Sequence, residues 1–154
     1  MAKALQIDFV SDVVCPWCVI GLRELETALD RLRDVVEPSI HFQPFELNPA
    51  MPYEGQNIGA HIAEKYGRPP EEMAVRRAQM KDRAAGLGFR METNSESRIY
   101  NSFDAHRLLH WAGLEGRQAA LKHALFEAYF SEGLNIADSD VLVGKAEAVG
   151  LDAE

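Results

Sequence analysis

The only two cysteines of this 154-residue chain, Cys15 and Cys18, stand three positions apart near the N-terminus. Residues 5–10 before them alternate between apolar and polar side chains, as a half-buried strand does. Residues 19–36 after them carry apolar side chains at spacings of three and four, as an amphipathic helix does. The cysteines therefore lie where a strand passes into a helix, and this junction constrains the fold more than any other feature of the sequence.

The start of a helix is a place where a thiol becomes reactive. Pro16 suits the first helical position, because the N–H that proline lacks would be unpaired there. Cys15 then faces the unpaired N–H groups and the positive end of the helix dipole, which stabilise a thiolate. Cys18 lies one turn further on, with its α-carbon roughly 5–6 Å away, a separation that a disulfide allows. We therefore expect a dithiol–disulfide pair in which Cys15 attacks and the shielded Cys18 resolves the mixed disulfide.

A C-x-x-C pair is also half of a zinc site, which needs two further ligands at fixed spacing. The available histidines are His106 with His110, one helical turn apart, or His41 with His61. Neither couple belongs to a second C-x-x-C or to a His-Glu-x-x-His pattern, and the proline inside the motif favours redox chemistry. We therefore predict no metal ion, and two unrelated core cysteines are the remaining alternative.

The first 50 residues predict one βαβ unit. A strand over Leu5–Val10, a helix that continues to Val36 and a strand over Ser39–Gln43 would give two parallel strands joined by a right-handed crossover. Pro38 is expected to stop the helix. Two parallel strands alone do not make a stable sheet, and no residues after Phe45 offer two more convincing strands. We therefore expect the missing C-terminal strands to follow this chain or to come from a partner chain, and we favour the former.

From residue 51 onward the pattern is helical. Five helices are expected, each closely followed by a glycine: Ile58–Tyr66, Pro70–Ala85, Asn101–Ala112 with Asn101 as its N-cap, Arg117–Phe130 and Asp138–Val149. The predicted division is therefore a βαβ part over residues 1–50, a helical part over residues 51–150, and the start of a further part at residues 151–154.

The charge balance excludes some classes of partner. The formal net charge is −8 and no basic run is present, so a nucleic-acid partner is not expected. The N-terminus lacks the apolar run of a signal peptide, and no stretch reaches the length of a membrane span, which predicts a cytoplasmic protein without a membrane partner. In a reducing compartment, two cysteines are more often catalytic or metal-binding than a structural disulfide.

Residues 12–21, Asp-Val-Val-Cys-Pro-Trp-Cys-Val-Ile-Gly, resemble the active-site segment of DsbA-like thioredoxin-fold oxidoreductases, in particular the FrnE-like branch of the superfamily that includes 2-hydroxychromene-2-carboxylate isomerase. Three further segments resemble the same branch in matching order: residues 44–49, 101–108 and 125–133. The resemblance implies an α/β, thioredoxin-like fold with an all-helical domain inserted after the second strand. The family continues with a strand pair, a cis-proline loop and a final helix, for which these residues offer no match.

The resemblance implies a thiol–disulfide oxidoreductase or isomerase that acts on protein or small-molecule disulfides through Cys15 and Cys18, without an organic cofactor. Pro16, Trp17 and His106 are the expected substrate contacts, although Trp17 could pack locally and His106 could be an ordinary buried helix residue. Glutathione as a small-molecule partner and a homodimer both remain open. The alternatives are a glutathione-dependent isomerase or kappa-type transferase, which needs no resolving thiol, and an inactive truncated fragment.

Overall fold

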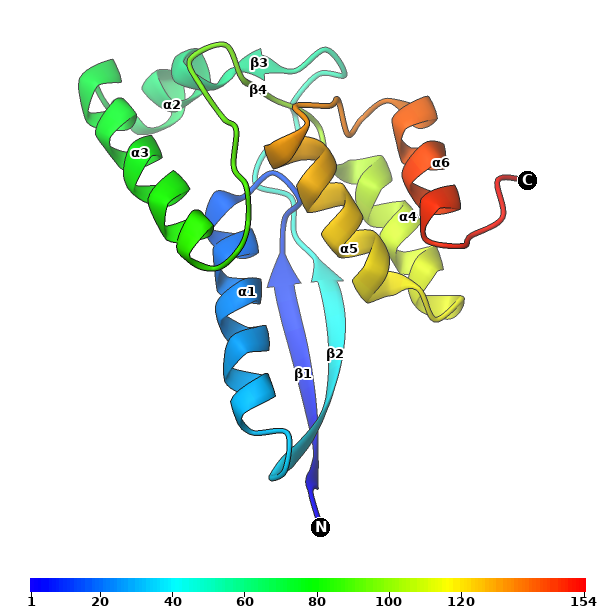
Figure 1. Cartoon of the computed structure of the whole chain (residues 1–154). Coiled ribbons are helices and arrows are strands. Elements are labelled where there is room, and N and C mark those ends of the chain that lie inside the picture. The colour runs from blue at the N-terminus through cyan, green and yellow to red at the C-terminus, as the bar shows by residue number, and fades with distance from the viewer.

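The computed structural model describes all 154 residues and consists of a long two-stranded ribbon with helices gathered around one of its ends (Figure 1). The elements in chain order are β1 (Lys3–Ser11), α1 (Pro16–Arg31), β2 (Val36–Pro44), β3 (Gln56–Asn57), α2 (Ile58–Tyr66), α3 (Pro70–Gly86), β4 (Arg98–Ile99), α4 (Phe103–Leu114), α5 (Gln118–Phe126), the π-helical turn η1 (Glu127–Ser131) and α6 (Ser139–Ala148). Helix α1 runs alongside the two strands, and the other helices lie around the carboxyl ends of β1 and β2, where the cysteines lie.

Strands β1 and β2 form the predicted parallel pair, joined by α1. Phe9 of β1 lies opposite Phe42 of β2, with their ring centroids 5.8 Å apart in an edge-to-face arrangement. The pairing continues to Ser11 opposite Pro44, so both strands are longer than the sequence predicted. They end together at the base of the helical part, and this brings the Cys15 segment next to the chain that leaves β2.

Helix α1 ends earlier than predicted. Its last residue is Arg31, and Val36, the predicted end of the helix, is the first residue of β2. The N–H groups of Val35 and Val36 both donate to the carbonyl of Leu32 in the turn between them. The apolar spacing of a helix runs on through this turn, which explains the overestimate. Pro38 does not stop the helix but lies within β2, which has a free edge where a missing N–H is tolerated.

The helical part follows the prediction, with differences at some helix ends. Helix α2 spans the predicted residues. The N-cap of α4 is Ser102, whereas Asn101, predicted for that position, accepts the Phe103 N–H with its Oδ1 at 2.9 Å. Gly113, the predicted stop, lies inside α4, and the left-handed residue after the helix is Gly116, with φ +71°. The predicted helix over residues 117–130 changes at its end into the π-helical turn η1.

A two-residue antiparallel ladder, β3 with β4, was not anticipated from the sequence. Gln56 lies opposite Ile99 and Asn57 opposite Arg98. Two residues are too few for an alternating pattern to be visible in the sequence. The ladder ties the loop after β2 to the segment that enters α4.

One hydrophobic core joins the βαβ part to the helical part. Val13, Val19 and Leu22 come from the N-terminal part, while Leu121 and Leu125 come from α5, and all five belong to the same buried cluster. Helices α4 and α5 both contact β2, and α3 contacts α1. None of the helices combines the length and apolar character required to cross a bilayer.

Candidate functional site

The cysteine pair lies at the start of α1, as predicted. Cys15 is the N-cap residue, with φ −93° and ψ 114°, and Pro16 occupies the first helical position. The Cys15 N–H donates to the Asp12 carbonyl at 3.2 Å, and the Cys18 N–H donates to the Cys15 carbonyl at 3.1 Å. Both thiols are free and half-buried. Trp17 between them is 57% exposed, so its side chain faces solvent beside the pair.

Each thiol shifts the pKa of the other through a side-chain hydrogen bond. This hydrogen bond is the main cause that lowers the pKa of Cys18 to about 6, helped by the backbone N–H of Asp12 and the positive charge of Lys122, against the effects of burial and of the Asp12 carboxylate. The same hydrogen bond, followed by burial, raises the pKa of Cys15 against the effect of the Cys18 and Trp17 N–H groups. The reduced pair thus holds one thiolate near neutral pH.

The sequence analysis expected the attacking thiolate at Cys15, and that role remains a prediction. The helix N–H groups do favour a Cys15 thiolate, but the hydrogen bond to Cys18 outweighs them. Either thiol can donate that hydrogen bond, since a thiol is both a weak donor and a weak acceptor. The negative charge can therefore pass from Cys18 to Cys15 by transfer of the shared proton.

Asp12, which the sequence analysis did not single out, lies buried at the end of β1 just before the pair. Its Oδ2 accepts the Leu47 N–H at 2.8 Å, and its Oδ1 lies 3.1 Å from His106 Nε2. Burial alone would raise the pKa of Asp12, but hydrogen bonds from His106, Ser102 and Leu47 hold it below its ordinary value of 3.8. The carboxylate is therefore ionised at neutral pH. The available signal was an acidic residue directly before two valines and three positions before Cys15.

His106 is 7% exposed and contacts Asp12. Its Nε2 contacts Asp12 Oδ1 at 3.1 Å and the Phe45 carbonyl at 3.0 Å. Because both partners are acceptors, Nε2 must carry the hydrogen. Its position matches the interpretation of His106 as a buried helix residue, and a contact with substrate remains a prediction.

Lys122 of α5 is a second buried charged residue that sequence reasoning missed. It is 1% exposed, and its Nζ lies 5.8 Å from the ring centroid of Phe42 and 5.0 Å from that of Phe126. Burial lowers the pKa of Lys122 to about 8, although the charges of Cys18, Asp12 and Cys15 act in the opposite direction. Its spacing of three and four from Leu125 and Phe126 places it on their buried face, and this spacing was the available signal.

The histidines considered as zinc ligands are dispersed. His41 and His110 are exposed, and His61 makes a hydrogen bond from its Nδ1 position to Gln56 Oε1 at 3.0 Å. No three His, Cys, Asp or Glu side chains gather as metal ligands would.

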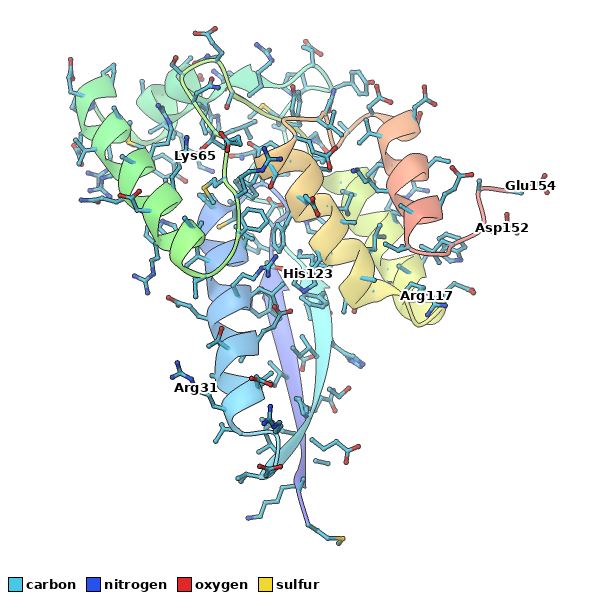
Figure 2. The ribbon with its side chains drawn as sticks, in the orientation of Figure 1. Arg31, Lys65, Arg117, His123, Asp152 and Glu154 are labelled. Atoms are coloured by element: carbon cyan, nitrogen blue, oxygen red, sulfur yellow. The ribbon has the colours of Figure 1, made fainter.

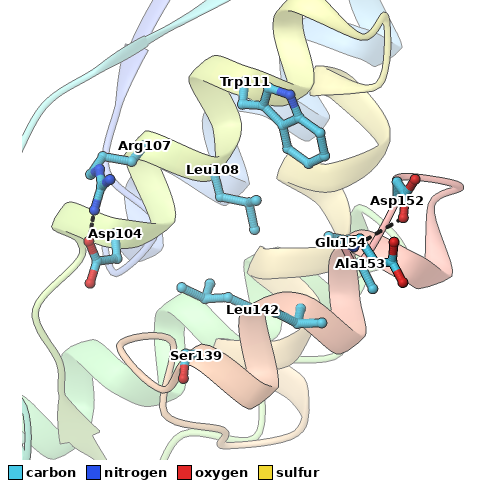
Figure 3. A pocket seen from close by; sticks show the side chains of 11 residues that line it. Asp104, Arg107, Leu108, Trp111, Ser139, Leu142, Asp152, Ala153 and Glu154 are labelled. Carbon is cyan, nitrogen blue, oxygen red and sulfur yellow. Dashed lines mark hydrogen bonds and ion pairs between the residues drawn. The ribbon is translucent and has the colours of Figure 1, made fainter.

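Two cavities bear on the search for a binding site. A cavity of about 580 Å³ lies between α4, α6 and residues 152–154, with Leu108 and Leu142 among its lining side chains (Figure 3). It includes neither cysteine. A smaller apolar cavity of about 40 Å³ adjoins Pro16, and its lining includes Val14 and three methionines: Met73, Met80 and Met91. Only the smaller cavity adjoins the redox pair.

The comparisons with known proteins agree with this geometry. The protein YwbO of Bacillus subtilis (strain 168) is 27% identical over 148 residues, which are 96% of this chain and 68% of YwbO. A crystal structure of a probable DsbA oxidoreductase from Streptomyces coelicolor is 30% identical, with a TM-score of 0.89 over 96% of this chain and 64% of that chain. The chain therefore spans about two thirds of the length of these relatives.

A more distant structure shares the fold. The cytosolic disulfide reductase DsbM from Pseudomonas aeruginosa, solved with GSH, is 20% identical, with a TM-score of 0.57 over 96% of this chain and 66% of that chain. The family description that matches residues 6–154 is the DSBA-like thioredoxin domain. The thioredoxin-like fold predicted from the sequence is confirmed, and the chain belongs to the DSBA-like thioredoxin domain family.

Proposed function

We propose that this chain carries the dithiol site of a thiol–disulfide oxidoreductase, which exchanges disulfides through Cys15 and Cys18. The observation that supports this most directly is the position of the two free thiols at the start of α1, where the pKa of Cys18 is lowered to about 6. A thiolate that forms near neutral pH is the species that attacks a disulfide.

The exchange proceeds in two balanced steps. The Cys15 thiolate attacks one sulfur of a substrate disulfide, the substrate S–S bond breaks, and the first substrate sulfur leaves as a thiolate. The Cys18 thiolate then attacks Cys15 Sγ, expels the second substrate sulfur as a thiolate and closes the Cys15–Cys18 disulfide. The pair gives up two electrons and two protons, and the substrate disulfide becomes a dithiol. The reverse sequence oxidises a substrate dithiol.

Apolar surface beside the pair favours substrates with apolar residues next to their disulfide. Trp17 is largely exposed, and the small cavity lined by Met73, Met80 and Met91 adjoins Pro16. Methionine side chains adapt to differently shaped apolar partners. We therefore include protein disulfides, with small disulfides such as glutathione disulfide, among the substrates.

Trapping tests the assignment of the two cysteines. Cys18→Ala should accumulate a mixed disulfide between Cys15 and a peptide or glutathione disulfide, visible by mass spectrometry under non-reducing conditions. Cys15→Ala should accumulate far less, because the attacking sulfur is absent. Equal amounts of mixed disulfide in the two variants would contradict the roles assigned to Cys15 and Cys18. Disulfide exchange by a variant that lacks both cysteines would contradict the proposed function.

A further inference from the structure

A third cavity, of about 310 Å³, lies where the segment between α3 and β4 passes the π-helical turn η1. Hydrogen bonds join its two sides. The Glu92 N–H donates to the Phe130 carbonyl at 2.8 Å, and the Tyr129 hydroxyl donates to the Arg98 carbonyl at 2.9 Å. The cavity has the size of a small-ligand site, and π-helical turns are frequent at functional sites.

Carboxylates dominate the lining of this acidic cavity. Glu92, Glu96 and Glu132 lie in its wall, and the one basic residue there is Arg98. The Arg98 guanidinium already donates to two backbone carbonyls that precede β3, at 3.0 and 2.9 Å. The lining therefore favours a positively charged ligand.

Neighbouring cations neutralise these carboxylates only in part. Lys145 Nζ lies 2.8 Å from Glu132 Oε1, whereas Arg90 Nη1 lies 4.0 Å from Glu92 Oε1 with both side chains largely exposed. Such exposed pairs are weak. The Glu96 carboxylate lies 3.5 Å from a serine hydroxyl and pairs with no cation. Glu92 and Glu96 are thus the carboxylates most available to a ligand.

Aromatic rings form another part of the wall. Tyr100, Tyr129 and Phe130 line the cavity, and Tyr129 packs edge-to-face against each of the other two. Aromatic faces attract ammonium and guanidinium groups and also contact the apolar stem of a lysine or arginine side chain. Carboxylates and aromatic rings together therefore suit a basic side chain better than a small inorganic cation.

Thr93 supplies a buried polar group in the same wall. Its side chain is 9% exposed and lines the cavity. Ser97 and Asn94 provide the side-chain hydrogen bonds that hold this segment, at 2.9 and 2.8 Å, and the Thr93 hydroxyl provides none of them. A buried hydroxyl without a partner is costly, and its oxygen can accept an N–H from a ligand.

The acidic cavity neighbours the apolar cavity beside the redox pair. Thr93, Tyr129 and Phe130 line both, and Pro16 of the cysteine motif lines the apolar one. A polypeptide whose cysteine reacts at the pair can therefore extend past the apolar cavity and place a nearby side chain in the acidic one.

We propose that the acidic cavity binds a lysine or arginine side chain of a protein substrate, close in sequence to the reacting cysteine. This inference rests on the proposed thiol–disulfide exchange and adds a specificity site to it. Glu92, Glu96 and Thr93 select the substrate and take no part in the transfer of sulfur bonds.

Peptides with one cysteine in a disulfide with glutathione test the proposal. One series has lysine at one to five positions from the cysteine, and a second series has glutamine in its place. The second-order rate constant for exchange should be about tenfold higher for the best lysine peptide than for its glutamine counterpart. Glu92→Gln/Glu96→Gln should lower this ratio to below about two, and Thr93→Val should lower it about threefold.

The matched control separates the cavity from the attraction that a net charge of −8 exerts on any basic peptide. Glu115→Gln/Glu147→Gln removes the same charge at exposed positions outside the cavity and should keep the wild-type ratio. Equal rates for lysine and glutamine peptides at every position would overturn the inference while the exchange activity stands. An equal fall of the ratio in the control variant would overturn it as well.

A binding measurement is independent of the exchange. Nα-acetyl-lysine methylamide, titrated into the wild-type chain, should shift the amide resonances of residues 92–98 and 129–133, and the uncharged norleucine compound should not. Shifts confined to other residues would overturn the inference. If the wild type exchanges with none of the peptides while the lysine compound still shifts these resonances, the proposed function fails instead.

Discussion

His106 of α4 donates its Nε2 hydrogen to Asp12 Oδ1 at 3.1 Å, a contact between residues 94 positions apart in the sequence. Asp12 precedes the first cysteine by three residues, so this hydrogen bond joins the helical part to the backbone that presents the redox pair. His106 also holds the Phe45 carbonyl, and Asp12 also holds the Leu47 N–H. The two residues thus hold together the segments that follow β1 and β2 at the carboxyl ends of these strands.

Removal of the imidazole should therefore destabilise the fold strongly. His106→Ala leaves the ionised Asp12 buried without one of its hydrogen-bond donors, and we expect the free energy of unfolding to fall by about 3 kcal/mol. Urea denaturation followed by circular dichroism measures this. His110→Ala, which removes an exposed histidine from the same helix, should change stability by no more than about 0.5 kcal/mol. Similar losses for the two variants would contradict the assignment.

Asp12 should make stability depend on pH at acidic values. Its folded-state pKa lies below the ordinary value of 3.8, so its contribution is present above that value and is lost as the pH falls through the lower, folded-state pKa. Asp12→Asn should reduce the free energy of unfolding by about 2 kcal/mol at pH 7, and its difference from wild type should shrink below about pH 4. Urea midpoints between pH 7 and pH 3 test this, with exposed Asp34→Asn as a control that should follow wild type. A difference that stays constant with pH would refute the prediction.

The low pKa of Cys18 should depend on the neighbouring thiol. Cys15→Ala removes the hydrogen bond that contributes most to lowering the pKa of Cys18, so this pKa should rise from about 6 toward its ordinary value of 9.0. The rate of alkylation by iodoacetamide at pH 6.5 should then fall about tenfold or more. Cys15→Ser retains a hydroxyl donor and should keep much of the effect. An alkylation midpoint that does not move in Cys15→Ala would show that other groups hold the thiolate.

One side chain of α5 hydrogen-bonds to the outer edge of β2 at Phe42. Gln118 accepts the Phe42 N–H with its Oε1 at 3.0 Å and donates from Nε2 to the carbonyls of Phe42 and Leu109 at 3.3 and 3.1 Å. Gln118→Ala should lower stability by about 1–2 kcal/mol and promote association through the uncovered edge. Urea denaturation and sedimentation velocity measure the two effects, and Gln79→Ala on α3 is the control. A variant that stays as stable and as monodisperse as this control would contradict the role of Gln118.

The sequence was sufficient wherever the deciding contacts are local. Pro16 and the spacing of the cysteines placed the pair at a helix start, and glycines marked most helix ends. The sequence did not predict the structure where segments far apart in the chain contact each other. The apolar spacing of a helix continued through the turn at Leu32, so the end of α1 could not be located from periodicity. The partners of Asp12 depend on how α4 packs against β2, which no local pattern contains.

The shared core and the buried contacts of Asp12 also bear on how the chain folds. His106 reaches Asp12 across a separation of 94 positions in the sequence, and contacts of such long separation form slowly. In the unfolded chain, Cys15 and Cys18 have neither the helix start nor the buried lysine, and they react as ordinary thiols. The two thiols therefore reach their full reactivity only when the helical part packs against the strands. Their reactivity thus indicates that folding is complete.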